Sequence, residues 1–139
     1  MAGIYLHIPF CKKACHYCNF HFSTSLGRKD EMWNAILREL EIRQDYLQGA
    51  ELESIYFGGG TPSLLSAAEL ERFFELIYRQ YRVLPTAEIT LEANPDDLDK
   101  GTLQALRQTP VNRLSIGVQS FFDADLSFMN RAHGAVQAI

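Results

Sequence analysis

The sequence predicts an α/β fold in which a parallel sheet of about four strands alternates with helices, as in part of an open, TIM-like barrel. Two observations support this prediction. Four short apolar segments are each followed by a stretch with helical spacing, and polar or glycine-rich residues come directly after every one of the four. Parallel strands joined by right-handed crossovers end at the same edge of a sheet. We therefore expect those residues to gather at one rim, where such folds bind their ligands.

The first strand–helix unit extends to about residue 49. Residues 4–10 begin with an alternation of apolar and polar side chains, which is typical of a strand. Asp30 and Glu31 suit the first turn of a helix, because carboxylates there meet free backbone N–H groups. Apolar side chains then recur at helical spacing to about residue 47, and Gly49 suits the end of this helix.

The second unit has clearer boundaries. A short apolar strand at 54–57 leads directly into three consecutive glycines at 58–60. Ser66 and Glu69 have the spacing of a capping box, in which each side chain satisfies a backbone N–H group of the other. They predict a helix that ends at about Tyr81.

Two further units complete the predicted sheet. We expect Pro85 to interrupt the chain before a third strand at 88–93, and Asp99 to cap a helix that ends at about residue 108. A fourth strand is predicted at 113–118, and Asp123 opens a fourth helix. The strand order 1-2-3-4 with helices on one face leaves an unpaired edge and an uncovered face. Both are suited to pairing with a second copy, so we expect a homodimer.

Composition excludes several classes of function. With 139 residues, of which 47% are hydrophobic, the chain can bury the core of one ordinary domain. Its formal net charge of −4 excludes a strongly basic nucleic-acid-binding surface. No apolar run approaches the roughly 18 residues of a transmembrane helix, and the N-terminal residues lack the pattern of a signal peptide. We therefore expect a cytoplasmic protein with at most peripheral membrane contact and no nucleic-acid partner.

Three cysteines, Cys11, Cys15 and Cys18, lie within eight residues directly after the first predicted strand. Thiolates select zinc or iron–sulfur clusters. A four-iron cubane normally takes four thiolates, so three would leave one iron open to a ligand. A Cys3His zinc site with His16 or His21 is the alternative, although zinc motifs usually combine two distant cysteine pairs. A disulfide is disfavoured because three thiols leave one over.

The other rim segments supply groups that suit a small polar ligand. The glycines at 58–60 let a ligand approach the backbone or else form a tight turn, and they lack the Lys-Ser/Thr ending of a P-loop. Glu92 is suited to accept hydrogen bonds from a ribose diol or to remain a solvated acid. Gln119 faces either a ligand or its own loop. Tyr17 is suited to stack on adenine or to pack against the cysteine loop.

Other polar residues receive structural interpretations. His7 is expected to be a supporting imidazole rather than a catalyst. Lys12 and Lys13 are expected to face water while offsetting the negative charge of a thiolate-ligated cluster. Glu39 and Arg43 have the spacing of a surface pair on one helix.

Five segments follow one another in an order that resembles a known family. With the C-x3-C-x2-C spacing, they resemble the radical SAM (S-adenosylmethionine) superfamily, and within it the oxygen-independent coproporphyrinogen III oxidase group and its heme-chaperone branch. The resemblance covers essentially the whole chain. The segments are Tyr5–Cys11, Gly58–Pro62, Glu92–Pro95, Val111–Ser120 and Asn130–His133.

The resemblance implies that Cys11, Cys15 and Cys18 bind a [4Fe–4S] cluster whose open iron binds SAM. In this family the reduced cluster splits SAM to give a 5′-deoxyadenosyl radical. Heme or a porphyrin is the implied partner, delivered by a heme chaperone or, as the alternative, oxidatively decarboxylated in porphyrin biosynthesis. The implied SAM contacts are Tyr5, Tyr17, Gly59, Gly60, Thr61, Glu92, Gln119 and Arg131, the last two of which serve a second SAM in the oxidases.

Two departures from the family pattern affect this interpretation. The oxidases carry a fourth cysteine two residues after the third, where this chain has Phe20. That difference favours the heme-chaperone branch. Family members are also considerably longer, with an open barrel of about six strand–helix units. Residues 1–139 are therefore expected to be the N-terminal part of a radical SAM core domain, with the heme-binding residues outside them.

Overall fold

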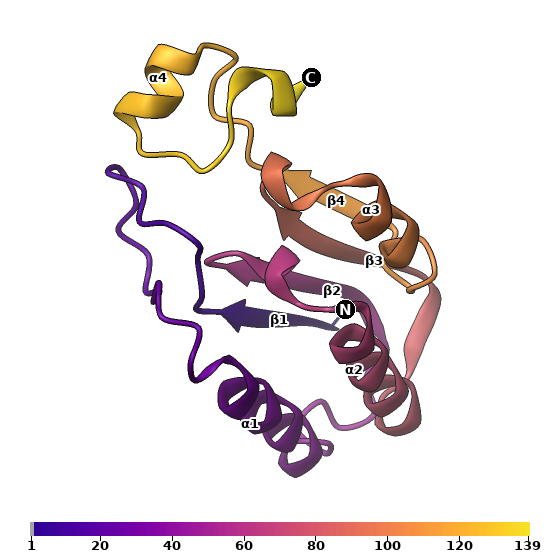
Figure 1. Cartoon of the computed structure of the whole chain (residues 1–139). Helices are drawn as coiled ribbons and strands as arrows, with labels where there is room; N and C mark the ends of the chain where they lie inside the picture. Colours follow the sequence, from indigo (N-terminus) through magenta and orange to yellow (C-terminus); the bar gives the residue numbers. More distant parts are fainter. Residues whose placement is uncertain (1) are drawn as a thin grey trace.

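The computed structural model describes residues 2–139 and contains a four-stranded parallel sheet in the order β1-β2-β3-β4, as predicted (Figure 1). The strands are β1 (Ala2–Ile8), β2 (Leu52–Gly59), β3 (Val83–Ala93) and β4 (Arg113–Ile116). The helices are α1 (Lys29–Ile42), α2 (Ala67–Gln80), α3 (Lys100–Leu106) and α4 (Asp123–Phe128). Short 3-10 turns occupy Pro62–Leu64, Pro95–Asp97 and Ala135–Ala138.

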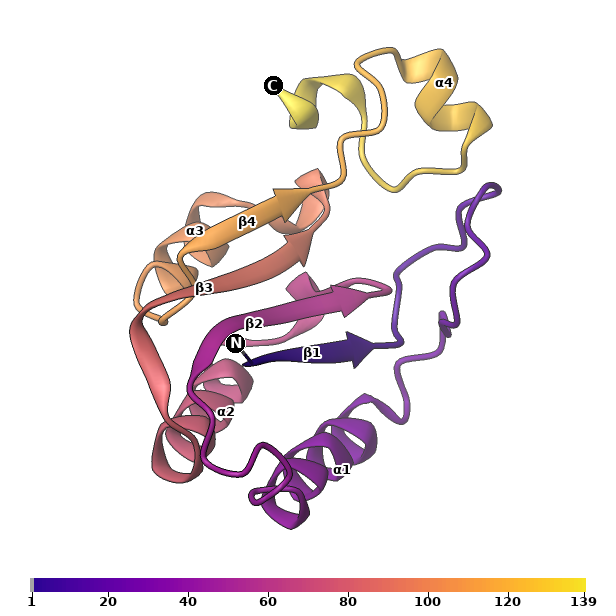
Figure 2. The same cartoon turned by 180° about the vertical axis from the view of Figure 1, so that it is seen from behind.

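The helices that connect the strands all lie on one face of the sheet. Figures 1 and 2, which view the molecule from opposite sides, show α1, α2 and α3 packed against one face while the other stays uncovered. The segment that contains α4 lies beyond the ends of the strands, beside the long loop that follows β1. The predicted arrangement, with the helices on one face, is therefore confirmed.

The two faces of the sheet differ sharply in chemistry. In β1, Leu6 and Ile8 are buried against the helices while Tyr5 and His7 alternate toward the uncovered face. The strand register continues this pattern across the sheet, so the uncovered face is polar. Its side chains are Tyr5, His7, Ser54, Tyr56, Glu88, Thr90, Glu92, Arg113 and Ser115. Self-association stays a prediction. Because the uncovered face is polar, we expect self-association to use the strand edges more than this face.

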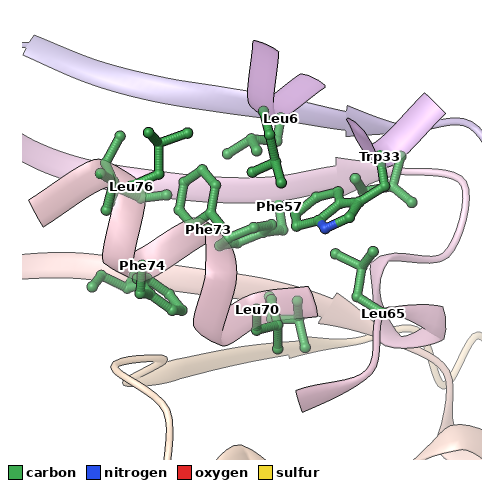
Figure 3. Packing of buried hydrophobic residues seen from close by; sticks show 14 of the residues in the cluster. Leu6, Trp33, Phe57, Leu65, Leu70, Phe73, Phe74 and Leu76 are labelled. Carbon is green, nitrogen blue, oxygen red and sulfur yellow. The ribbon is translucent and has the colours of Figure 1, made fainter. Parts of the chain in front are cut away.

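Aromatic side chains fill the core between the sheet and α2. The Phe57 and Phe73 rings meet edge to face at 5.0 Å, and Phe73 and Phe74 do so at 5.2 Å (Figure 3). Trp33 of α1 packs beside them, only 2% exposed. Burying one such side chain contributes about 1.5–3 kcal/mol. This cluster fixes the outer layer and thereby the positions of the strand ends.

Several element boundaries differ from the prediction. Pro85 lies within β3 and does not interrupt it, because β2 and β3 do not pair between Val83 and Glu88 and no ladder N–H is needed there. The first helix ends at Ile42, since turns follow it to the left-handed residues Gln48 and Gly49. The helix-surface pair Glu39–Arg43 is confirmed at 2.7 Å.

Two elements are shorter than predicted, whereas β2 and β3 begin earlier than predicted. Strand β4 ends at Ile116, and α3 ends at Leu106. Across residues 2–139, none of the helices combines the length and apolar character needed to cross a bilayer.

Replacing Phe73, the central ring of the core, should destabilise the fold. Phe73→Ala removes a fully buried side chain, so we expect the free energy of unfolding to fall by about 3–5 kcal/mol. The same change at Phe128, which is 82% exposed, should alter it by less than about 0.5 kcal/mol. Urea titration of both variants measures the difference, and equal losses would contradict the proposed core.

The contact between α1 and α2 should make the free energy of unfolding depend on pH. Lys29 and Glu69 form an ion pair at 2.5 Å, and both side chains are mostly buried. Burial raises the pKa of Glu69, but the hydrogen bonds from Lys29 and from the Ser66 N–H and hydroxyl outweigh it and lower the pKa overall. This stabilisation is present above the unfolded-state pKa of about 4.3 and is lost as pH falls through the folded value.

We therefore expect Glu69→Gln to lower the free energy of unfolding at pH 7 and to flatten its decline in acid. Glutamine retains the capping-box geometry at this position, so the change tests the charge alone. Chemical denaturation between about pH 7 and pH 3 measures the effect. The exposed Glu75 on the same helix is the matched control, since Glu75→Gln should leave the pH dependence unchanged.

Candidate functional site

The loop between β1 and α1 brings the three cysteines to the rim of the sheet. All three are free thiols and are partly exposed. They line a cleft of about 460 Å³ at the carboxyl ends of the four strands, to which every strand–loop junction contributes. Of the site residues predicted from the sequence, those that line this cleft are Cys11, Cys15, Cys18, Tyr17, Gly59, Gly60, Thr61, Glu92, Gln119 and Arg131. The predicted gathering of these residues is therefore observed for all but Tyr5.

Gly60 is required because the cysteine loop crosses directly over it. Its N–H donates to Ile8 O at 2.8 Å, which continues the β1–β2 pairing into the loop. A Cβ at this position would lie 2.6 Å from Phe10 O and 2.9 Å from Cys11 Sγ. The neighbouring Gly59 has a φ of 108°, a conformation that other residues rarely adopt. The glycine turn therefore lets the first cysteine sit against the end of β2.

The donor set fits an iron–sulfur cluster better than a single zinc ion. Within residues 2–139, no three His, Cys, Asp or Glu side chains converge as the ligands of one metal ion do. The thiolates of a cluster bind different irons and need not meet at one point. His16, one of the two histidines considered for a zinc site, donates from Nδ1 to Phe128 O at 2.8 Å.

The pKa of the Cys11 thiol is altered by burial and by its neighbours. Burial raises the pKa of Cys11, the thiols of Cys18 and Cys15 add to this, and Thr61 and Arg131 act in the opposite direction. Thiolates are soft ligands, and binding to a cluster would stabilise the thiolate form that burial of Cys11 disfavours. Together with the space that Gly60 leaves open, the donor set fits the cluster that the sequence predicts.

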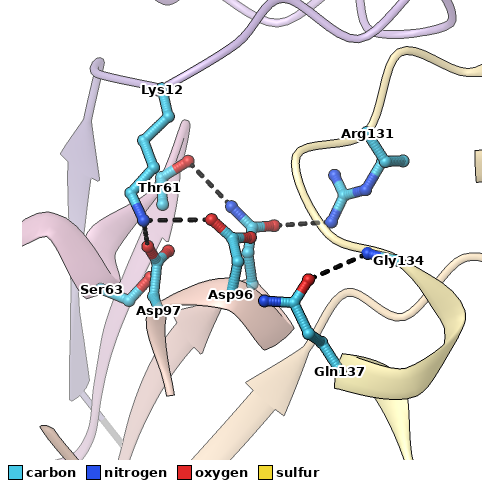
Figure 4. Close-up of polar contacts among 9 residues, drawn as sticks. Lys12, Thr61, Ser63, Asp96, Asp97, Arg131, Gly134 and Gln137 are labelled. Carbon is cyan, nitrogen blue, oxygen red and sulfur yellow. Dashed lines mark hydrogen bonds and ion pairs between the residues drawn. The ribbon is translucent and has the colours of Figure 1, made fainter. Parts of the chain in front are cut away.

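Lys12 is exposed, as predicted, but its ammonium is also paired with two carboxylates. Its ammonium pairs with Asp96 at 3.0 Å and, more closely still, with Asp97, which is 9% exposed (Figure 4). Ser63 donates to the same Asp97 carboxylate at 2.6 Å. Burial lowers the pKa of Lys12, but the two aspartates outweigh it and raise the pKa overall. Lys12 therefore ties the cysteine loop to the turns after β2 and β3 and does not lend free charge to a cluster.

A second anchor comes from the segment after α4. Asn130 donates to Ala14 O at 2.8 Å, and the His16 N–H donates to Met129 O at 3.1 Å. Asn130 adopts a left-handed φ of 57°, which turns its side chain toward the loop. The cysteine loop is thus held from both sides, by Lys12 at its start and by Asn130 at its centre.

Arg131 connects the cysteine loop to the ends of β3 and β4. One terminal nitrogen lies 3.5 Å from Cys15 Sγ and donates to Tyr17 Oη at 3.2 Å. The other donates to Asn94 Oδ1 and Gly117 O, both at 2.7 Å. Its Nε is buried and has no partner within residues 2–139. This guanidinium places a fixed positive charge on the wall of the cleft.

Tyr5 does not line the cleft but lies on the uncovered face below it. Its hydroxyl and His7 Nδ1 share a hydrogen bond at 3.1 Å, and His7 Nε2 contacts His21 O at 3.0 Å. His7 therefore supports the cysteine loop, as predicted. The Tyr5 ring stacks on Tyr56, with centroids 6.0 Å apart.

A model of the radical SAM superfamily matches residues 5–139. The chain belongs to the radical SAM superfamily. Membership implies a [4Fe–4S] cluster and SAM.

The curated relatives of this radical SAM chain include proteins named for heme. It is 36% identical over 138 residues to "Heme chaperone HemW" of Escherichia coli K12, covering 98% of this chain and 36% of that protein. It is 40% identical over 134 residues to the Lactococcus lactis protein of the same name, covering 96% and 34%. A mouse relative, "Radical S-adenosyl methionine domain-containing protein 1, mitochondrial", is 37% identical, covering 99% and 31%. The chain thus spans about a third of the length of the curated relatives it matches.

Two solved structures share the fold. Coproporphyrinogen III oxidase (HemN) of Escherichia coli matches with a TM-score of 0.87 at 30% identity, covering 97% of this chain and 32% of that one. The archaeal Methanocaldococcus infernus Elp3 matches with a TM-score of 0.60 at 13% identity, which shows the fold alone. The predicted fold, a partial TIM-like radical SAM barrel, is confirmed.

Filling the space beside Cys11 should disrupt the site. Gly60→Ala places a methyl group within 3 Å of the Phe10 carbonyl and the Cys11 sulfur, so the loop must shift. We expect a loss of about 1–3 kcal/mol in unfolding free energy and a marked loss of bound iron and sulfide after anaerobic reconstitution. Gly27→Ala is the control, because its nearest neighbour would lie 3.9 Å away. Equal iron and sulfide contents in the two variants would refute the close approach.

Proposed function

We propose that this chain is a radical SAM [4Fe–4S] protein of the heme-chaperone type, which takes part in binding and delivering heme. The observation that carries the proposal is the gathering of three thiols, a glycine turn and an arginine around one cleft at the rim of the sheet. When bound, the cluster supplies an iron with an open coordination position and an electron for cleavage of SAM. The relatives named "Heme chaperone HemW" support the heme part of the proposal.

In this proposal the residues of the cleft have separate tasks. Cys11, Cys15 and Cys18 hold the cluster, and the glycine turn, which has no Cβ, lets the polar end of SAM approach the backbone. Glu92 accepts hydrogen bonds from the sugar, and Tyr17 packs against the ligand. The remaining proposed contacts with SAM are made by Gly59, Gly60, Thr61, Gln119 and Arg131, whereas Tyr5 lies outside the cleft lining.

Phe20 favours the chaperone over an oxidase that acts on coproporphyrinogen III, which is the alternative. Its ring lines the cleft and is 60% exposed. An apolar ring cannot donate a proton or a hydrogen atom, as a thiol at the same place can. A residue beside the reacting centre shapes a reaction by positioning the substrate, so this exchange acts at the point where the two functions differ.

Anaerobic reconstitution tests the cluster. With iron and sulfide, the protein should bind about four of each, and Cys18→Ala should lose most of both because a ligand is removed. Asn19→Ala, at the next position in the cleft, is the control and should retain the cluster. Stoichiometric zinc without sulfide in the unaltered protein would instead establish the zinc site.

Reconstituted protein that also contains the heme-binding residues expected outside residues 1–139 separates the two candidate functions. A heme chaperone should bind heme and pass it to an acceptor, and should not decarboxylate coproporphyrinogen III in the presence of SAM and a reductant. Phe20→Cys should leave cluster content unchanged, since it alters none of the three ligands. Steady decarboxylation by the unaltered protein would overturn the chaperone proposal, whereas cleavage of SAM alone would not.

A further inference from the structure

Tyr56 lies directly beneath the cleft and touches one of its acidic residues. It projects from β2 onto the uncovered face of the sheet and does not line the cleft itself. Its hydroxyl donates to Glu92 Oε1 at 2.7 Å, across the β2–β3 pair. Glu92, which is partly exposed, lines the cleft beside Ser115, its register partner on β4. Tyr56 thus contacts the Glu92 carboxylate from the side opposite to a ligand in the cleft.

The Tyr56 ring is held rigidly in this position. Tyr5 stacks on one side of it, with ring planes 27° apart. A Cβ at Gly58 would lie 2.8 Å from the Tyr5 ring and 2.9 Å from the Tyr56 ring, so only glycine leaves room for both. Fixed rings of this kind lose little conformational entropy when they hold a partner.

The contact has the chemistry of a phenol bound to an ionised carboxylate. Its length of 2.7 Å is ordinary for an O–H···O bond and also falls at the upper limit of charge-assisted ones. The hydrogen bond to Glu92 raises the pKa of Tyr56, and burial adds to this. The nearby cation Arg113 is directed to Glu88, at 3.5 Å. Tyr56 therefore satisfies one oxygen of Glu92, and the other oxygen stays available to a ligand.

We infer that Tyr56 is a positioning residue that presents the Glu92 carboxylate to the ribose hydroxyls of a nucleoside ligand in the cleft. The inference rests on the proposed function, because it takes SAM as that ligand. A carboxylate has about four lone-pair positions, and fixing one oxygen aligns the rest with a pair of neighbouring hydroxyls. A freely rotating carboxylate would have to be ordered when the ligand binds, which weakens affinity. Tyr56 therefore acts on the sugar end of the ligand and not on the end that meets the cluster.

The experiment compares two ligands that share one end. SAM carries the ribose, whereas L-methionine carries only the amino acid end. Under anaerobic conditions we expect Tyr56→Phe, which removes one hydroxyl and keeps the ring, to weaken SAM binding roughly threefold to tenfold. Methionine binding, read from the electron paramagnetic resonance spectrum of the reduced cluster, should not change. Tyr78→Phe, on the helix-covered side at 50% exposure, is the matched control and should change neither.

A double-mutant cycle with Glu92→Ala assigns the effect to the pair. Tyr56→Phe should add little to the loss already caused by Glu92→Ala, because the acceptor of the Tyr56 hydroxyl is then absent. If Tyr56→Phe binds SAM as tightly as the unaltered protein does, or loses as much affinity for methionine as for SAM, the role of Tyr56 is overturned while the proposed function stands. Failure of the unaltered, cluster-loaded protein to bind SAM would overturn both this role and the proposed function.

Discussion

The site depends on the in-register parallel pairing of β1 with β2. Ile8 lies opposite Gly59, and the Gly60 N–H continues the ladder to Ile8 O, so the strand ends cannot slide past each other. A shift of one residue would turn the polar face inward and place a side chain where Gly60 meets Cys11. The aromatic core around Phe57 and Phe73 opposes such a shift, because a shift by one residue would also remove the apolar side chains of the strand from this core. The position of the first thiol is therefore set by the core as much as by the loop that carries it.

Around this constraint the loop is held by charges that are balanced locally. Lys12 is matched by two aspartates in the turn after β3, whereas Arg131 faces a thiol, a phenol and two oxygens. The ion pairs of Lys12 hold the loop in place. The contacts of Arg131 include no carboxylate, so its positive charge is not neutralised by these partners. A negatively charged cluster–thiolate set or a ligand carboxylate would therefore meet Arg131 and not Lys12. This division separates the residue that fixes the loop from the residue that shapes its electrostatics.

The sequence predicted what depends on local pattern. The Ser66 capping box, the four strands and their order followed from spacing and alternation, and the thiols and glycines were placed at the rim by topology. The contacts of Lys12, Asn130 and Tyr56 could not be predicted, because they join residues 84, 116 and 36 positions apart that carry no shared periodicity. Pro85 misled the prediction because a break in the β2–β3 pairing, which no local pattern reveals, removes the need for its missing N–H.

The contact between Arg131 and Cys15 joins residues separated by 116 positions. Chains grow at roughly 5–20 residues per second, so the cysteine loop exists for about 6–23 s before its arginine has been synthesised. During that interval the three thiols lack the Asn130 and Arg131 contacts that cover one side of the loop. A growing chain therefore passes through a stage at which these thiols are open to oxidants and stray metal ions. The contacts that complete this side of the loop therefore form only after the segment that follows α4 has been synthesised.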